Sequence, residues 1–230
     1  MRAWIDWYDS PQSIYANERH RDVHFRRIAQ DIARYVPGPH AVVLDYGCGE
    51  ALHAGIVAGA AARLILAEPA PGVRARVAAR FSGNGRITVC DLDDVAALPE
   101  ASVDLVVMHS VIQYMTAEEL DVALRRIRRL LKPAGVFVLG DVIAPDTPAS
   151  TDALALLRFG LAEGFFIAAG VSLARLLLSS YWRLRSSLGL SRYDAPAIAA
   201  RLAACGFSAS RQPANIGHNQ ARMTFLCRPA

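Results

Sequence analysis

Two glycines and three acidic residues stand where the strands of a parallel sheet would end. The segment Asp45-Tyr46-Gly47-Cys48-Gly49 directly follows the apolar run Val42-Val43-Leu44, and Glu68 and Asp91 end two later apolar runs. Glycines let the backbone turn sharply and come close to a ligand, where a Cβ atom would obstruct it. Because ligands bind at the carboxyl ends of parallel strands, the two later acids can accept hydrogen bonds there from hydroxyl or amino groups of a ligand.

Each of these features has a simpler structural explanation when it is taken alone. A Gly-x-Gly turn can be an empty tight turn between a strand and a helix, and a single acid at a strand end is often a helix N-cap. Their combination at successive strand ends favours a ligand site. A dinucleotide-binding enzyme is the main alternative on the same architecture, but its fingerprint needs a third glycine five positions after Gly47, where this chain has Leu52.

Short apolar runs alternate with helical stretches along the chain, and glycine or proline separates them. The strands are apolar throughout, as strands covered on both faces are, and strands alternating with helices form a parallel, doubly wound sheet. We expect strands at 41–45, 64–68, 86–91, 103–108 and 136–141, helices at 12–36, 117–131 and 195–205, and a final strand pair at 207–213 and 222–228.

The composition suits a single folded domain: 53% of the 230 residues are hydrophobic and 20% are charged, which excludes a disordered chain. The formal charge of +4 permits attraction to nucleic acid or to an anionic membrane. The four cysteines lack the spacing of a metal site or a disulfide framework. The first residues lack the apolar core of a signal peptide, so we expect a cytoplasmic protein.

Five segments follow one another in the order of a known motif set. They are Val42–Gly49, Glu68, Cys90–Leu92, Val103–Ser110 and Leu131-Lys132-Pro133-Ala134-Gly135. In this order they resemble the class I S-adenosylmethionine-dependent methyltransferases, specifically the group that acts on small molecules. The resemblance covers residues 41–141 well and extends to 194–228, and the family's usual third glycine is replaced by Ala51.

The resemblance implies an α/β fold: a three-layer, doubly wound, seven-stranded and mostly parallel sheet (Rossmann-like), with a helical insertion after strand five. Its last strand would be antiparallel. We expect one domain over 1–230, comprising an N-terminal helical cap (1–40), a cofactor-binding core (41–145), a helical insertion or lid (146–192) and a last helix with a strand pair (193–230). The cofactor would be S-adenosylmethionine, and the implied cofactor-binding residues are Asp45, Gly47, Gly49, Glu68, Asp91, Leu92, His109 and Tyr15.

Two histidines are candidates for a catalytic role. A base is needed only if the methyl acceptor must lose a proton, as a hydroxyl must. His109 follows the fourth strand and would lie beside the methyl group, and His218 stands in a polar loop before the last strand. The alternative for each is an ordinary polar residue in a turn or hairpin loop.

Other polar clusters favour neither a metal nor a nucleic-acid partner. His20 and His24 are four residues apart on the N-terminal helix, but Arg21 stands where a zinc-protease pattern needs glutamate. We interpret them as exposed, solvated side chains and predict no metal. No Asn-Pro-Pro-Tyr element follows the fourth strand, as it does in enzymes that methylate amino groups of bases. We interpret the arginines at 125–129 as a solvated helix face.

The leucine-rich stretch at 153–190 is too apolar to be a free surface loop. Glu163 and Arg175 interrupt it, so no apolar run reaches the ~18 residues needed to cross a bilayer. It can pack on the sheet, pair with a second subunit as a homodimer, or form an apolar lid with peripheral membrane contact through Trp182, Arg183 and Arg185. We favour a lid over an apolar or amphipathic small-molecule acceptor.

These observations predict methyl transfer from S-adenosylmethionine to an oxygen or nitrogen of a small, apolar or amphipathic molecule. The alternative is a non-catalytic S-adenosylmethionine-binding or partner-regulating protein with the same fold.

Overall fold

Within residues 2–9, 15–176 and 189–230, which the computed structural model describes, seven strands form one sheet. Their order across the sheet is β3-β2-β1-β4-β5-β7-β6. Strand β7 runs antiparallel to both of its neighbours, and the pairs from β3 to β5 are parallel. The predicted fold class, including the antiparallel last strand, is confirmed. The strands are β1 (Val42–Tyr46), β2 (Arg63–Ala67), β3 (Ile87–Cys90), β4 (Val103–His109), β5 (Leu131–Val142), β6 (Phe207–Arg211) and β7 (Met223–Pro229).

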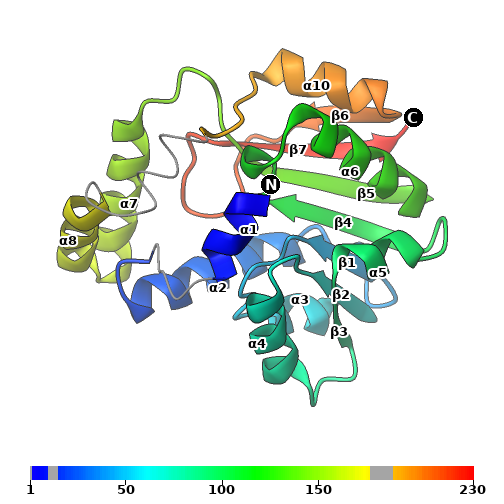
Figure 1. Cartoon of the computed structure of the whole chain (residues 1–230), viewed down its shortest axis with the longest axis horizontal. Coiled ribbons are helices and arrows are strands. Elements are labelled where there is room, and N and C mark those ends of the chain that lie inside the picture. The colour runs from blue at the N-terminus through cyan, green and yellow to red at the C-terminus, as the bar shows by residue number, and fades with distance from the viewer. Residues whose placement is uncertain (1, 10–14, 177–188) are drawn as a thin grey trace.

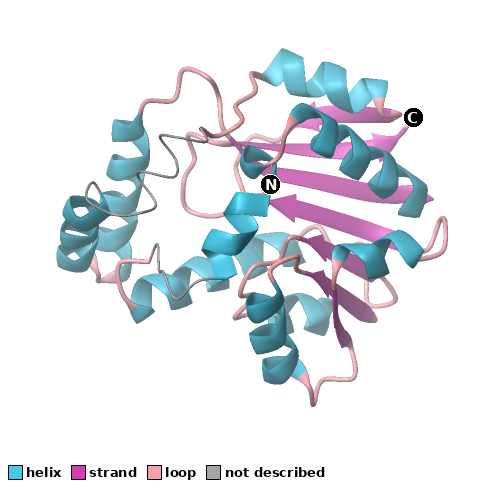
Figure 2. Cartoon of the chain, in the orientation of Figure 1, coloured by secondary structure: helices cyan, strands magenta, loops and turns pink. Residues whose placement is uncertain are grey.

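Helices cover both faces of this sheet (Figures 1 and 2). One buried apolar cluster joins the sheet to α5, α6 and α10, and a second joins it to α2, α3 and α4. The helices are α1 (Arg2–Asp9), α2 (Glu18–Ala33), α3 (Ala54–Ala60), α4 (Pro71–Phe81), α5 (Leu92–Ala97), the 3-10 turn η1 (Ile112–Tyr114), α6 (Ala117–Leu130), α7 (Ala149–Glu163), α8 (Phe166–Leu176) and α10 (Ala195–Ala204).

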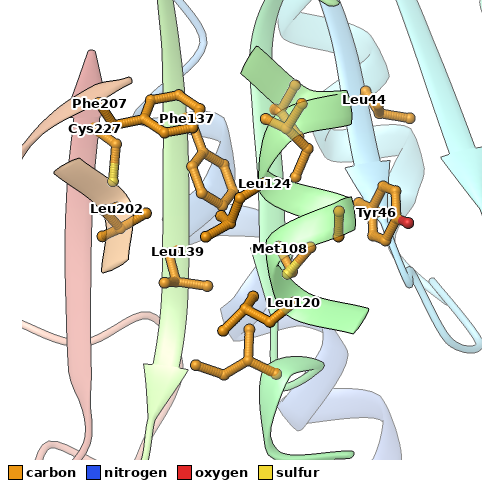
Figure 3. Close-up of a cluster of buried hydrophobic side chains, with 14 of the residues drawn as sticks. Leu44, Tyr46, Met108, Leu120, Leu124, Phe137, Leu139, Leu202, Phe207 and Cys227 are labelled. Carbon is orange, nitrogen blue, oxygen red and sulfur yellow. The ribbon is translucent and has the colours of Figure 1, made fainter. Parts of the chain in front are cut away.

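The larger cluster shows why the sheet holds together on the α6 face (Figure 3). Leu120, Leu124 and Ile127 lie on one side of α6 and are fully buried. They pack in the same cluster as Phe137 and Leu139 of β5. Each such side chain contributes roughly 1.5–3 kcal/mol when it is removed from water. The helix expected at 117–131 is confirmed as α6.

The arginines of α6 were interpreted as a solvated face, and this was wrong for three of the four. Arg126 donates to the Leu92 carbonyl, Arg128 to the Gly206 and Ala230 carbonyls, and Arg129 to the Leu98 and Ala96 carbonyls. Only Arg125 among them is exposed. Long guanidinium side chains can satisfy carbonyls at the ends of neighbouring elements, which spacing along one helix does not reveal.

The fifth strand was expected at 136–141, but β5 begins earlier and includes the Lys132-Pro133-Ala134-Gly135 segment. Val103 of β4 pairs with Leu131 and Leu105 pairs with Val136, so the residues between them form a bulge. Lys132 Nζ donates to both carboxylate oxygens of Asp104, at 2.9 and 2.8 Å. One of these oxygens also accepts the backbone N–H of Val42, at 2.8 Å. Asp104 therefore ties β4 to the start of β1 and to β5.

Helices α7 and α8 form the insertion after β5 and lie beyond the carboxyl ends of the parallel strands (Figure 1). Helix α7 is capped by Gly164, which has a left-handed backbone conformation with a φ of +77°. Leu161 and Ile167 are exposed on this helix pair. The predicted stretch at 153–190 is therefore two helices as far as residue 176, and Trp182, Arg183 and Arg185 lie outside the described residues. Among the described helices, none is both long and apolar enough to cross a membrane.

The N-terminal helix was expected at 12–36, but the structure has two helices in the described part of this region. Helix α2 begins only at Glu18, where the Asn17 side chain accepts the backbone N–H of His20. Helix α1 was not predicted. Residues 10–14, which the expected helix included in part, lie outside the described residues.

Replacing Asp104 by Ala is expected to lower the free energy of unfolding by about 2 kcal/mol, because the Val42 N–H loses its acceptor. Lys132→Met should cost less than about 1 kcal/mol, because the ammonium group is partly exposed. Urea unfolding of both variants measures the difference. Equal losses of unfolding free energy in the two variants would show that the ion pair with Lys132, and not the hydrogen bond from the Val42 N–H, provides the stabilisation by Asp104.

Candidate functional site

A cavity of about 740 Å³ opens at the carboxyl ends of the central strands. Small-molecule sites usually measure about 300–1,000 Å³. The cavity lies at the end of β1, which pairs with β2 on one side and with β4 on the other. From β1 the chain first adds strands on the β2 side of the sheet and then on the β4 side, so the strand order reverses at this point. In open α/β sheets this reversal is where ligands bind. Of the cofactor-binding residues expected from the sequence, Asp45, Gly47, Gly49, Glu68, His109 and Tyr15 line the cavity.

The glycine turn after β1 needs its glycines for two different reasons. Gly47 has a φ of +83°, and a Cβ atom there would lie 2.6 Å from a Val111 methyl group. Gly49 has a φ of +57°, and no atom lies within 4 Å of the place where its Cβ would be. The backbone N–H groups of Gly47 and Cys48 both donate to the Ala67 carbonyl. The turn is thus fixed on its β2 side and open at Gly49.

Glu68 holds the glycine turn against the start of α4. Its Oε2 accepts the Gly49 N–H and its Oε1 accepts the Ala70 N–H, both at 2.8 Å. Burial raises the pKa of Glu68, while these two backbone hydrogen bonds oppose the shift. Asp45 lies nearby, and burial together with the charge of Glu68 raises its pKa to about 7. The floor of the cavity therefore carries two closely spaced carboxyl groups that favour a cationic ligand.

Helix α1 forms a wall of the cavity that the sequence analysis missed. Trp4 packs on Tyr114 with ring centroids 4.7 Å apart, and the hydroxyl groups of Tyr8 and Tyr114 are 2.7 Å apart. Asp9 accepts the Val73 N–H at the first turn of α4, at 3.0 Å. A side chain at Gly72 would collide with Asp9, since a Cβ would lie 2.5 Å from its carboxylate. The signal was present in the aromatic residues at positions 4, 7 and 8, which share one face of a helix.

Asp91 and Leu92 do not line the cavity. Asp91 is the N-cap of α5, where its side chain accepts the N–H groups of Asp93 and Asp94. These hydrogen bonds lower the pKa of the Asp91 carboxyl, which is exposed. The simpler explanation for a lone acid at a strand end, a helix cap, describes what Asp91 does in this structure. Its expected role in cofactor binding remains a prediction.

His109 lies at the end of β4 and lines the cavity together with His24 of α2. Both residues are partly buried, and the Nδ1 atom of each is buried and has no hydrogen-bond partner among the described residues. Burial lowers the pKa of both rings, and for His109 it outweighs the opposing charges of Asp141 and Asp31. The two imidazoles are therefore neutral at physiological pH, and a neutral ring nitrogen can accept a proton.

His218, the second catalytic candidate, does not line the cavity. Its ring stacks on Phe159 of α7 at 4.4 Å, and His20 stacks on Phe165 at 4.7 Å. His20 is only 5% exposed, so its interpretation as a solvated side chain was wrong. The insertion supplies the phenylalanines that cover it, which the sequence of α2 alone could not indicate. Burial lowers the pKa of His20 and of His218 to about 4.

The strand ends opposite Glu68 carry a second polar group of residues. Ser110 directly follows β4, and Asp141 lies at the end of β5. Both residues have a positive φ (+57° and +64°), and the Ser110 hydroxyl donates to Asp141 Oδ2 at 2.7 Å. Arg222, just before β7, donates to both oxygens of Asp152 on α7. All but Asp152 line the cavity. Sequence reasoning missed this group because only the topology brings 110, 141 and 222 together.

Among residues 2–9, 15–176 and 189–230, no group of three or more histidine, cysteine or acidic side chains is arranged to hold a metal ion.

Residues 44–139 match a family model described as a methyltransferase domain. The match runs from the end of β1 through the glycine turn and Glu68 to β5, which is the part of the chain that forms the cavity floor. This segment, which is less than half of the chain, is therefore similar to a methyltransferase domain. No curated protein matches the chain at significant similarity.

Several solved structures similar to this chain are described as methyltransferases. The Synechocystis PCC 6803 magnesium protoporphyrin IX methyltransferase with bound SAM has a TM-score of 0.59 at 14% identity, over 99% of this chain and 89% of that one. A Burkholderia thailandensis 1,6-didemethyltoxoflavin-N1-methyltransferase gives 0.55 at 19%, over 90% and 78%. A putative methyltransferase complexed with the Haloferax volcanii Trm112 activator gives 0.60 at 15%, over 90% and 91%. Identities this low show the fold of the chain alone.

His218→Phe is expected to make the protein less sensitive to acid. The pKa of His218 is about 4 in the folded chain and about 6.5 in the unfolded chain. Its contribution to the free energy of unfolding is therefore complete above pH 6.5 and is lost as the pH falls towards 4. Phenylalanine keeps the stacking on Phe159 and cannot titrate. The slope of unfolding free energy against pH between 6.5 and 4 should therefore fall by up to about 1.4 kcal/mol per pH unit.

Urea unfolding at several pH values measures this slope. The raised pKa of Asp45 acts in the opposite direction, stabilising the folded chain as the pH falls below about 7, but it is common to both proteins and cancels in the comparison. His40→Gln, at an exposed position, is the matched control. An unchanged slope in His218→Phe would contradict the assignment.

Proposed function

We propose that this chain binds S-adenosylmethionine in the cavity and transfers its methyl group to an oxygen or nitrogen of a small, apolar or amphipathic molecule. The observation that carries the proposal is the pair of hydrogen bonds by which Glu68 fixes the glycine turn at the reversal point of the sheet. Class I methyltransferases are enzymes that use this cofactor, and solved structures similar to the chain contain bound S-adenosylmethionine or S-adenosylhomocysteine.

The cavity residues fit this cofactor in shape and charge. Gly49 leaves open space at the turn, and each Glu68 oxygen has used one of its two lone pairs, so the carboxylate can still accept hydrogen bonds from ribose hydroxyls. S-adenosylmethionine carries a sulfonium and an ammonium group, and the carboxyl groups of Glu68 and Asp45 favour positive charge. When bound, the cofactor supplies an electrophilic methyl group.

The chain's own residues would orient the reactants and keep water out. Trp4, Tyr8 and Tyr114 form an aromatic wall on one side of the cavity. His109 lies at the end of β4 with a neutral ring, which suits a proton acceptor if the methyl acceptor has to lose a proton. We retain His109 as a candidate, whereas His218, stacked on Phe159, would act only through its neighbours.

The acceptor is proposed to be a small molecule. Two of the similar structures are named for small-molecule substrates, a protoporphyrin and a toxoflavin precursor. The insertion reaches the cavity through Asp152 of α7, which binds the cavity-lining Arg222. This contact supports the proposed role of the insertion as a lid. Homodimer pairing and peripheral membrane contact remain predictions, as does the cytoplasmic location.

Glu68→Gln is expected to weaken S-adenosylmethionine binding by about 10- to 100-fold, because the amide presents an N–H₂ group where a carboxylate oxygen was needed. Isothermal titration calorimetry measures the dissociation constant. Glu100→Gln, at an exposed position far along the chain, serves as the control and should bind like the wild type. Wild-type affinity in Glu68→Gln would remove the basis of the proposal.

The competing function, a non-catalytic binding or partner-regulating protein, is separated from catalysis by turnover. We expect S-adenosylhomocysteine to accumulate when the chain is incubated with S-adenosylmethionine and a panel of small aromatic alcohols and amines. Chromatographic quantification against a no-acceptor control gives the rate. Tight binding of S-adenosylmethionine with no release above the control for any member of the panel would favour the non-catalytic function.

A further inference from the structure

Four buried polar atoms at the cavity have no hydrogen-bond partner among the described residues. They are His24 Nδ1, His109 Nδ1, Gln113 Oε1 and Arg222 Nη1, and all four residues line the same cavity. A buried polar group without a partner costs about 1–3 kcal/mol, so such groups are rare unless a ligand satisfies them. Their concentration around one cavity indicates a ligand with polar groups of its own.

Arg222 is the most constrained of the four. Its side chain is 10% exposed, and its Nε and Nη2 atoms donate to Asp152 at 2.8–3.2 Å. These bonds fix the plane of the guanidinium group, because the fork of an arginine is rigid. Nη1 remains without an acceptor, and Asp141 Oδ2 is 3.9 Å away from it. This distance is an ion-pair contact but is too long for a hydrogen bond.

Asp141 is held as firmly as Arg222. Its backbone N–H donates to Asn215 Oδ1 at 3.1 Å, and its Oδ2 accepts the Ser110 hydroxyl at 2.7 Å. Both Asp141 and Ser110 have left-handed backbone conformations, which cost of order 1–3 kcal/mol each in residues other than glycine. Strained residues that support one another in this way occur preferentially at binding and catalytic sites.

The separation of the two atoms suits a ligand atom that accepts and donates hydrogen bonds at the same time. An oxygen atom can lie about 2.8 Å from both Arg222 Nη1 and Asp141 Oδ2, near the apex of a triangle whose base is their 3.9 Å separation. At that place it must accept a hydrogen bond from the guanidinium group and donate one to the carboxylate. A hydroxyl group does both with a single atom.

We propose that Asp141 and Arg222 bind the hydroxyl group of the methyl acceptor, and that Asp141 takes its proton, so that the chain is an O-methyltransferase. This inference rests on the proposed function. In the reaction the hydroxyl O–H bond breaks as its proton passes to the Asp141 carboxylate, and an O–CH₃ bond forms. The S–CH₃ bond breaks, and its electron pair remains on the sulfur of the departing thioether.

The position and charges of the pair fit this role. Strand β5, which ends near Asp141, is two strands from β1 in the sheet, or roughly 10 Å from the glycine turn, so Asp141 lies on the acceptor side of the cavity. Burial keeps His24 and His109 uncharged, which leaves Arg222 as the cation beside Asp141. An ammonium group would be repelled by Arg222, whereas an oxygen that loses its proton would be stabilised by it.

Binding of simple probes tests the proposal without requiring turnover. Phenol can donate and accept at the same oxygen, while anisole, its methyl ether, can only accept. In the presence of S-adenosylhomocysteine, phenol should bind at least about tenfold more tightly than anisole. It should also shift the ¹⁵N side-chain resonance of Arg222 in the wild-type protein, which is assigned by its disappearance in Arg222→Lys. Equal affinities, or no shift of this resonance with phenol, would overturn the proposal.

Substitution of the acid separates binding from proton transfer. Asp141→Asn keeps the size of the side chain, and asparagine tolerates a positive φ, so the variant should fold. We expect the phenol affinity to change less than threefold and kcat with a hydroxyl acceptor to fall about 100-fold. Asp146→Asn, at an exposed position in the loop after β5, is the matched control. An unchanged kcat in Asp141→Asn, or faster methylation of aniline than of phenol by the wild type, would refute the role of Asp141.

Cofactor binding and the hydroxyl site are tested by different measurements. If S-adenosylmethionine does not bind the wild-type chain, the proposed function fails. If S-adenosylmethionine binds normally to the wild type and to Asp141→Asn, but phenol and anisole bind equally, only the assignment of the hydroxyl site fails.

Discussion

The cavity depends on one carboxylate that joins two loops. Glu68 comes from the end of β2 and accepts N–H groups from the glycine turn after β1 and from the start of α4. Parallel strands bring these loops to the same edge of the sheet, but pairing between β1 and β2 ends at Tyr46 and Ala67. Beyond that point, Glu68 and the Ala67 carbonyl hold the turn in place. The turn is therefore arranged before any ligand arrives, which reduces the entropy lost on binding.

The two ends of the cavity differ in how their polar groups are satisfied. At the glycine turn, the carboxylate of Glu68 and the N–H groups of Gly47 and Cys48 are paired within the chain. Around the ends of β4 and β5, several buried polar atoms lack partners among the described residues. The half at the glycine turn is formed before any ligand binds, whereas the half around β4 and β5 needs hydrogen-bond partners from a ligand. This difference suits a site that binds a constant ligand first and a more specific ligand second. The contact between Arg222 and Asp152 links the second half to the insertion.

The sequence predicted β1, β2 and β3 well because each is a largely apolar run that ends next to an acid. It predicted Glu68 and the glycine turn for the same reason, since local pattern and chain order place them together. It did not predict Asp141 and Arg222, which are 81 positions apart and meet only because β7 pairs antiparallel to β5. Nor did it predict the burial of His20, because the phenylalanines that cover it belong to a distant insertion. For Asp91 the sequence could not distinguish two roles, because an acid at the end of a strand can be a helix N-cap or a ligand contact. In the structure it is the N-cap of α5.

Helix α1 has a practical consequence for the study of this chain. It places Trp4 and Trp7 in the wall of the cavity, and the sequence contains only one further tryptophan, Trp182. Indole emission depends on the polarity and the aromatic neighbours of the ring, and Trp4 already packs against Tyr114. The intrinsic fluorescence of the unlabelled protein, with Trp182 replaced by Phe, therefore reports from inside the cavity. Occupancy and exchange can be followed in real time without an attached dye.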